Sequence, residues 1–282
     1  MELNKLGAEV FIPDGAPIEE ALERTTCMAI SAHQDDIEIM AYDGIAKCFG
    51  KDDAWFTGVV VTDGKGSPRR GIYSSCTSEE MQEIRKKEQK KAAFVGEYAA
   101  QFLLNYSSSE VKDDQNTEII SELAQILSLT QPEVVYTHNL VDKHDTHVAT
   151  VIKVIKAIRE LPREIRPKKL YGCEVWRDLD WIPDDKKVVF DLSPHENIAS
   201  ALIGLYDSQI CVGKRYDLAE MGRRKAHSAF SHVLNINNAS SAGYAMDMTP
   251  LIEKDERDIK QYVMYYITVF ANEVLDNIDK FN

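Results

Sequence analysis

The sequence predicts an α/β fold built on a mainly parallel sheet, and three observations support this prediction. Short apolar runs of strand length alternate with longer segments that carry helical spacing, and this alternation is typical of strand–helix–strand units. A hydrophobic content of 44% over 282 residues is sufficient for a large buried core. Beyond Leu192 the pattern changes, and we expect only helices there. The chain therefore reads as an α/β core followed by a helical C-terminal extension.

Six strands are expected, and four helical segments separate the first five of them. The strands are placed at residues 26–31, 56–62, 101–104, 133–137, 169–175 and 187–192. The helical segments are residues 37–49, 78–95, 118–129 and 145–161. Their apolar side chains recur at steps of three and four residues, which places them on one helical face. Such helices can cover the faces of a parallel sheet.

Three helices are expected beyond residue 192. Residues 196–207 and 218–230 are helical in pattern, residues 232–247 read as a loop, and the last helix spans about 252–278. Thr249 and Pro250 resemble a helix cap followed by proline at the first helical position. The last helix carries an apolar stripe of Ile259, Val263, Ile267, Phe270, Val274 and Ile278. We predict that this stripe packs inside the chain; a subunit interface, and hence a homo-oligomer, is the alternative.

We predict a single domain over residues 1–282, with the α/β core at about 26–210 and the extension at about 211–282. The formal net charge of −13 makes nucleic acid and anionic membranes poor partners, because both require a basic surface. No N-terminal signal pattern is present, and no apolar stretch reaches the roughly 20 residues that span a bilayer. We therefore expect a cytoplasmic protein without a membrane span.

The five cysteines are widely scattered and form no CxxC pair. This spacing argues against a disulfide framework and against a zinc site made of thiolates. If the protein binds a metal, its ligands must be histidine and aspartate.

Two short segments contain four of the seven histidines, and each follows a predicted strand. AHQDD, residues 32–36, follows the strand at 26–31, and HNLVDKHDTHVAT, residues 138–150, follows the strand at 133–137. Because the carboxyl ends of parallel strands meet at one edge of a sheet, the two segments are expected to face the same crevice. Each alone could be a helix cap or a surface pair, but their occurrence together favours a functional site.

These residue types match the needs of a hydrolytic zinc centre. Catalytic zinc commonly takes three protein ligands and leaves one position for water. His33 and Asp36 are three residues apart, so a turn entering a helix can direct both to one point, and one of His144 and His147 can supply the third ligand. Asp35 and the remaining histidine are then available as a proton acceptor and as a group that stabilises an oxyanion or protonates a leaving amine.

The same residues resemble a known family. Residues 32–38, AHQDDIE, resemble the AHPDDE signature of the PIG-L/LmbE-like zinc-dependent de-N-acetylases, and residues 144–147, HDTH, resemble their downstream HxxH motif. Weaker matches are the loop VTDGKGSPR at 61–69, a helix with Arg85, Glu88, Ala92, Ala93 and Gly96, and the YDSQ element at 206–209. The resemblance extends from about residue 26 to about residue 210.

This resemblance implies a Rossmann-like fold and the hydrolysis of an N-acetyl group from an amino sugar or glycoconjugate. It implies His33, Asp36 and His147 as zinc ligands, Asp35 as the general base and His144 as the polarising histidine. Other divalent metals suit the same donor set.

The chain departs from the family pattern at two places. Gln34 replaces the usual proline, and Asp145-Thr146 replaces the common Pro-Asp. If an acid orients His144 from behind, Asp142 or Asp145 must supply it.

Three further residues are candidates for substrate binding. They are Asp63, Arg85 and His138, and each lies near a strand end or on the helix that resembles the family. Tyr171, Trp176 and Trp181 are aromatic residues that either stack against a sugar or pack in the core.

Two other functions fit the sequence. One is a metal-dependent amidohydrolase that acts on a non-sugar amide, and the other is a carbohydrate-binding protein with a structural metal. An unused carboxylate at Asp35 argues against a structural metal, because such a site has no need of a free base.

Overall fold

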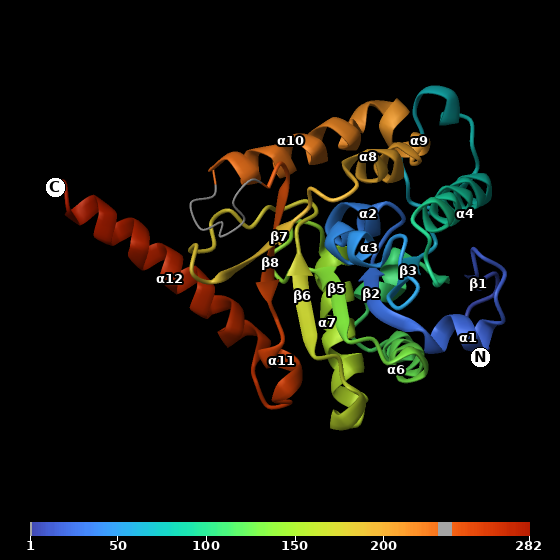
Figure 1. The fold of residues 1–282 in the computed structure, drawn as a ribbon, viewed down its shortest axis with the longest axis horizontal. Coiled ribbons are helices and arrows are strands. Elements are labelled where there is room, and N and C mark those ends of the chain that lie inside the picture. Colours follow the sequence, from blue (N-terminus) through green and yellow to red (C-terminus); the bar gives the residue numbers. More distant parts are fainter. Residues whose placement is uncertain (1, 231–238) are drawn as a thin grey trace.

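The computed structural model describes residues 2–230 and 239–282, and its central feature is one mixed sheet (Figure 1). The strand order is β1-β4-β3-β2-β5-β6-β8-β7. The strands are β1 (Glu9–Phe11), β2 (Thr25–Ser31), β3 (Trp55–Thr62), β4 (Ala100–Tyr106), β5 (Val134–His138), β6 (Lys169–Cys173), β7 (Lys187–Asp191) and β8 (Ala242–Asp247). The predicted α/β class with a mainly parallel sheet is confirmed.

The five central strands run parallel, and the order of the strands switches between β2 and β5: the chain adds β3 and β4 on one side of β2, then β5 and β6 on the other. From β2 the chain moves outward through β3 and β4, then returns to pair β5 on the other side of β2. Ile30 lies opposite Thr137 in the β2–β5 pair, so the two strands end at the same level. A crevice outside the carboxyl ends is expected at such a switch point. The two histidine-rich segments follow these two strands.

Helices cover both faces of the sheet. Two separate apolar clusters divide along β3, where Val59 and Val61 join one cluster and Val60 joins the other. The first cluster takes in α6 (Glu118–Thr130) and α7 (Asp145–Glu160), and the second takes in α2 (Asp36–Met40), α3 (Tyr42–Cys48), α4 (Ser78–Val95) and α8 (Glu196–Gly204). The remaining helices are α1 (Ile18–Glu23), α5 (Ser108–Lys112), α9 (Asp207–Gln209), a π-helical turn η3 (Ile210–Lys214), α10 (Tyr216–Phe230), α11 (Pro250–Glu253) and α12 (Ile259–Asp279).

The expectation of helices only beyond residue 192 is wrong. Residues 242–247 form β8, which pairs antiparallel with both β6 and β7. The predicted loop at 232–247 is therefore replaced by a strand at its end, while residues 231–238 lie outside the described residues. The small and polar residues of this segment give no strand pattern in the sequence. The strand is stabilised by two neighbouring strands that supply hydrogen bonds on both sides.

Two expected helices are each divided in the structure. The segment at 37–49 forms α2 and α3, which meet at Ala41, and the last segment forms α11 and α12. Pro250 occupies the first turn of α11 as predicted, although the Thr249 side chain makes no cap hydrogen bond there.

The apolar stripe of α12 is buried only at its beginning. Ile259 and Val263 pack against the core and Tyr266 is buried, whereas Ile267, Phe270, Val274 and Ile278 expose between 37% and 55% of their surface. Figure 1 shows the C-terminal part of α12 extending away from the sheet. The prediction of intramolecular packing thus holds for the first half only. Within the described residues, no helix combines the length and apolarity needed to cross a membrane.

Candidate metal centre and its cavity

The end of β2 places three polar side chains at the carboxyl edge of the sheet. Asp35 adopts a left-handed backbone conformation with φ of 87°, which is rare outside glycine and turns the chain sharply into α2. Asp36 begins α2, and its Oδ2 accepts the backbone N–H of His33 at 2.8 Å. This bond closes a tight turn that brings the His33 ring back over Asp36.

The end of β5 supplies the histidines on the other side of the crevice. His144 is the N-cap residue of α7, where its Nδ1 accepts the backbone N–H of Thr146 at 3.3 Å. His147 lies in the first turn of α7 and is fully buried. The three-residue spacing of HDTH thus places the His144 and His147 rings side by side, with their centroids 4.6 Å apart. The His33 ring faces them from the other strand end, and its centroid lies 4.9 Å from that of His144.

Three donor atoms form a nearly equilateral triangle. His33 Nδ1 lies 3.2 Å from Asp36 Oδ2 and 3.1 Å from His147 Nε2, and the latter two atoms are 3.4 Å apart. Zinc bonds of about 2.0–2.1 Å in tetrahedral geometry separate their ligand atoms by about 3.3 Å. The residues present therefore fit a zinc ion with three protein ligands.

Two overlapping triads of candidate ligands share His147 among the described residues: one adds His33 and His144, the other Asp36 and His138. Hydrogen bonds separate ligands from neighbours. His138 Nε2 already accepts the backbone N–H of Ala32 at 2.8 Å, so its lone pair is occupied. His144 uses its Nδ1 lone pair on Thr146, which leaves Nε2 as an N–H donor in the neutral ring. Neither arrangement leaves the facing nitrogen free to bind a metal.

Asp142 supports His147 from behind. Its Oδ1 lies 3.4 Å from His147 Nδ1 and accepts the backbone N–H of His144 at 2.9 Å. Although burial opposes ionisation, His147 lowers the pKa of Asp142 to about 2. A carboxylate behind a histidine fixes the ring and its tautomer, as is common around metal ligands. Asp142 therefore contacts the ring of His147 but only the backbone of His144, which is the histidine that the sequence expected it to orient. Asp145 is exposed and makes no contact with either ring among the described residues.

Asp35 is the carboxylate beside the triangle. Burial raises its pKa to about 7, the charge of Asp36 adds to this effect, and Arg85 opposes it. The Arg85 Nη2 lies 3.3 Å from Asp35 Oδ1. A general base is most effective when its pKa lies near the working pH. For Asp36 the opposite holds: despite burial, His147, His138 and His33 keep its pKa well below the ordinary value.

Arg85 belongs to a buried network that holds the Asp35 turn. Its guanidinium also contacts Glu88 at 3.2 Å and donates to the backbone carbonyl of Gln34. Glu88 in turn accepts the N–H and hydroxyl of Ser208, each at 2.7 Å. The α4 helix and the YDSQ element are thereby connected to the site. Arg85 lines the cavity, but only 2% of it is exposed.

Gln34 ties the same turn to the end of β3. Its Nε2 donates to the carbonyl of Thr62 at 3.0 Å, and its Oε1 faces Gly64. A side-chain hydrogen bond thus restrains the backbone where the family pattern has a proline ring.

The other two candidates for substrate binding do not lie among the residues that line the cavity. His138 is fully buried behind the triangle, where its ring stacks on His147 at 3.9 Å. Asp63 accepts the backbone N–H of Lys65 at 3.0 Å and so shapes its own loop. Among the aromatic candidates Trp176 lines the cavity, whereas Tyr171 packs against Phe190 and Trp181 against Phe270.

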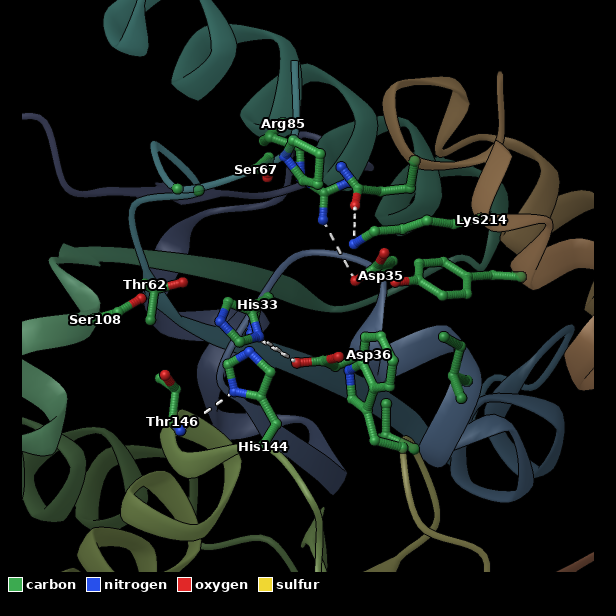
Figure 2. Close-up of a pocket in the computed structure, with 18 of the residues that line it drawn as sticks. His33, Asp35, Asp36, Thr62, Ser67, Arg85, Ser108, His144, Thr146 and Lys214 are labelled. Carbon is green, nitrogen blue, oxygen red and sulfur yellow. Dashed lines mark hydrogen bonds and ion pairs between the residues drawn. The ribbon is translucent and has the colours of Figure 1, made fainter. Parts of the chain in front are cut away.

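The candidate metal centre opens into a cavity of about 510 Å³. Figure 2 shows His33, Asp36 and His144 on one side of it, with Arg85 and Lys214 directed toward Asp35 from the other. One wall of the cavity comes from residues for which the sequence predicted no function, namely Lys214, Tyr216, Ala219, Glu220 and Arg223. They lie on η3 and α10, and no local motif marks them, because they reach the site only through the packing of α10 on β8 and α8.

Residues 28–158 match the family described as PIG-L: GlcNAc-PI de-N-acetylase. Over these residues the chain matches the PIG-L/LmbE-like family. The matched residues include the ends of β2 and β5 and all three atoms of the donor triangle. They stop before β6, so the cavity wall from η3 and α10 lies outside the match. No curated protein matches the chain in sequence.

Several solved structures share the fold of this chain. N,N'-diacetylchitobiose deacetylase from Pyrococcus horikoshii aligns with a TM-score of 0.63 and 17% identity over 82% of this chain and 86% of its own. The A40926 pseudoaglycone deacetylase Dbv21 aligns with a TM-score of 0.56 and 16% identity over 79% of this chain and 97% of its own. GalB, the 4-carboxy-2-hydroxymuconate hydratase from Pseudomonas putida KT2440, aligns with a TM-score of 0.61 and 17% identity over 79% and 95%. These likenesses establish the fold, which carries more than one reaction.

Proposed function

We propose that this protein is a zinc-dependent hydrolase that removes an N-acetyl or similar small N-acyl group from an amino sugar or glycoconjugate. The observation that carries the proposal is the triangle of His33 Nδ1, Asp36 Oδ2 and His147 Nε2, with sides of 3.1–3.4 Å. These three residues would hold the zinc, because each facing atom has a lone pair free: Asp36 Oδ2 accepts the His33 N–H with one of its two. The lone pairs of His138 Nε2 and His144 Nδ1 are already occupied. The family match and the two deacetylases of similar fold support the same reaction class.

When bound, zinc polarises the amide carbonyl and increases the acidity of water at its open position. The chain's own residues perform the proton transfers. Asp35, held by Arg85 at 3.3 Å, is placed to take the proton of the attacking water. Its pKa of about 7 allows it to accept that proton and later to release it to the leaving amine.

His144 is placed to stabilise the oxyanion. Its Nδ1 is fixed by Thr146, so the ring presents its Nε2 edge as an N–H donor. Burial and the neighbouring His147 lower its pKa to about 4, which keeps the ring neutral near pH 7 and preserves this hydrogen-bonding role.

The test measures zinc content and acetate release together, with N-acetylglucosamine derivatives as substrates. The purified protein should bind about one zinc, lose activity when a chelator removes it, and recover when zinc is returned. Asp35→Asn should retain the metal but lose about 10²- to 10⁴-fold in kcat, because the proton acceptor is gone. His147→Ala should lose the metal itself.

The outcomes separate the alternatives. Release of acetate only from non-sugar amides would indicate an amidohydrolase of different substrate class. Tight binding of both zinc and sugar without any turnover would indicate a carbohydrate-binding protein with a structural metal. Full activity after complete metal removal would contradict the proposal.

A further inference from the structure

The cavity contains two lysines that form no ion-pair contact with any carboxylate of the described residues. Among the lining acids, Asp35 pairs with Arg85, Asp36 lies among the histidines, and Glu220 pairs with Arg223. Two lining lysines, Lys112 and Lys214, form no ion pair with any residue that the structure describes. The excess charge in the cavity is therefore cationic, although the whole chain carries a net charge of −13.

Lys214 is held in place by aromatic rings. Its Nζ lies 5.2 Å from the Tyr216 ring centroid and 5.8 Å from that of Trp176. The ammonium donates to Gln209 Oε1 at 3.4 Å, and Figure 2 shows the side chain pointing into the cavity toward Asp35. Burial lowers the pKa of Lys214, which indicates that its charge has lost part of its hydration without an acid in ion-pair contact. An anionic ligand would compensate this loss.

Lys112 extends the positive region to another wall. It is exposed at the end of α5, and its helix also contributes Ser108 to the cavity lining. A basic residue at a helix C-terminus would usually be explained by the helix dipole, but α5 has only five residues and a weak dipole. The Ser67 and Ser108 hydroxyls lie in the same lining and can donate hydrogen bonds to an anion.

We propose that the substrate carries an anionic substituent, a phosphate or a carboxylate, that Lys214 and Lys112 bind while the N-acyl group lies at the metal centre. This inference rests on the proposed function and adds a substrate class to it. A cationic cavity raises the local concentration of anionic substrates, whereas a neutral substrate gains no such electrostatic attraction. The two lysines act in this proposal as residues that select the substrate.

The test compares the zinc-loaded protein on matched substrates. Methyl N-acetylglucosaminide is the neutral probe, N-acetylglucosamine 1- and 6-phosphates form the phosphate arm, and N-acetylmuramic acid forms the carboxylate arm. We expect at least one anionic arm to exceed the neutral probe by about tenfold or more in kcat/KM, because a hydrogen bond to a charged group discriminates by that amount. Raising the salt from about 50 mM to about 500 mM should reduce this preference.

Lys214→Met and Lys112→Met should each reduce the ratio of kcat/KM for the anionic probe to kcat/KM for the neutral probe. Zinc content and circular dichroism check that each variant folds. Lys65→Met is the matched control, because Lys65 is already paired with Glu79 at 3.5 Å and does not line the cavity. A preference for either anionic arm that disappears in the lysine variants supports the inference and identifies the anion. Equal kcat/KM for neutral and anionic probes, or a preference that survives both substitutions, overturns it.

A direct binding measurement separates this inference from the proposed function. If the zinc-loaded protein hydrolyses none of the probes, calorimetry can still compare the binding of N-acetylglucosamine 6-phosphate with that of the methyl glycoside. Tighter binding of the phosphate that Lys214→Met abolishes supports the anion site while the hydrolase proposal fails. Equal binding, together with absent turnover, contradicts both.

Discussion

The two walls of the cavity differ in origin and in character. The sheet-edge wall, made by His33, Asp35, Asp36 and His144 with His147 buried behind it, follows directly from the ends of β2 and β5. The outer wall, made by Trp176, Lys214, Tyr216, Ala219, Glu220 and Arg223, comes from the loop after β6 and from η3 and α10.

The difference lies in how each wall is held. Backbone hydrogen bonds and buried carboxylates fix the sheet-edge wall, whereas Trp176 in the outer wall is 46% exposed. The family match covers the first wall and stops before the second. In the proposed function, the reacting groups belong to the first wall and the groups that select the substrate belong to the second.

One residue joins the two walls. Asp142 contacts His147 and His144 through Oδ1, and its Oδ2 accepts the backbone N–H of Trp176 at 3.1 Å. Changes at Asp142 should therefore disturb the sheet-edge wall first, while changes in the outer wall should leave the metal in place.

The largest effect is expected for Asp142→Asn. The amide can no longer provide two negatively charged acceptors, so His147 loses its orientation and zinc affinity should fall about 10- to 100-fold. Competition with a metal-binding dye measures this change. Asp145→Asn is the control, because Asp145 is exposed and should leave zinc affinity unchanged. Equal losses in the two variants would show that only net charge matters.

An intermediate effect is expected for Gly64→Ala, which tests the packing behind the sheet-edge wall. Gly64 has φ of +72°, and an added Cβ would lie 2.7 Å from Gln34 Oε1 and 3.0 Å from Arg85 Cβ. The strained backbone and the close contacts should lower the free energy of unfolding by about 2 kcal/mol. Denaturant unfolding checks this value.

Gly66→Ala is the matched control in the same loop. No atom lies within 4 Å of its added Cβ, so its unfolding free energy should change by less than about 0.5 kcal/mol. If both variants lose the same stability, Gly64 has no special role in holding the Gln34 turn.

The smallest effect is expected for Trp176→Ala, in the outer wall. Loss of an aromatic face that stacks on substrate should raise KM by up to about tenfold, with kcat and zinc content nearly unchanged. Steady-state kinetics on the best N-acetylated substrate checks this, and Trp176→Phe should recover part of the binding. A fall in kcat of the same size would instead place Trp176 in the chemical step, through its contact with His144 at 6.4 Å between ring centroids.

Local patterns were sufficient for the central strands and for the helices that follow them. The helix predicted at 78–95 is α4 with the same bounds, because Thr77 and Glu80 form a capping box and Gly96 follows the last residue. The strand β8 could not be predicted, since residues 242–247 become a strand only between β6 and β7. Likewise the placement of His138 behind His147, outside the cavity lining, depends on the pairing of β5 with β2.

The sequence by itself determined the α/β class, the two strand ends that face one crevice, and the side chains able to bind a metal there. Those features depend on spacing within a few residues, such as the three-residue steps from His33 to Asp36 and from His144 to His147. Only the tertiary structure decided that Asp142 supports His147 and that Gln34 anchors the turn to β3. It also brought Lys214 to the cavity, because contacts between distant segments depend on how α10, η3 and the sheet pack, and no local pattern contains that information.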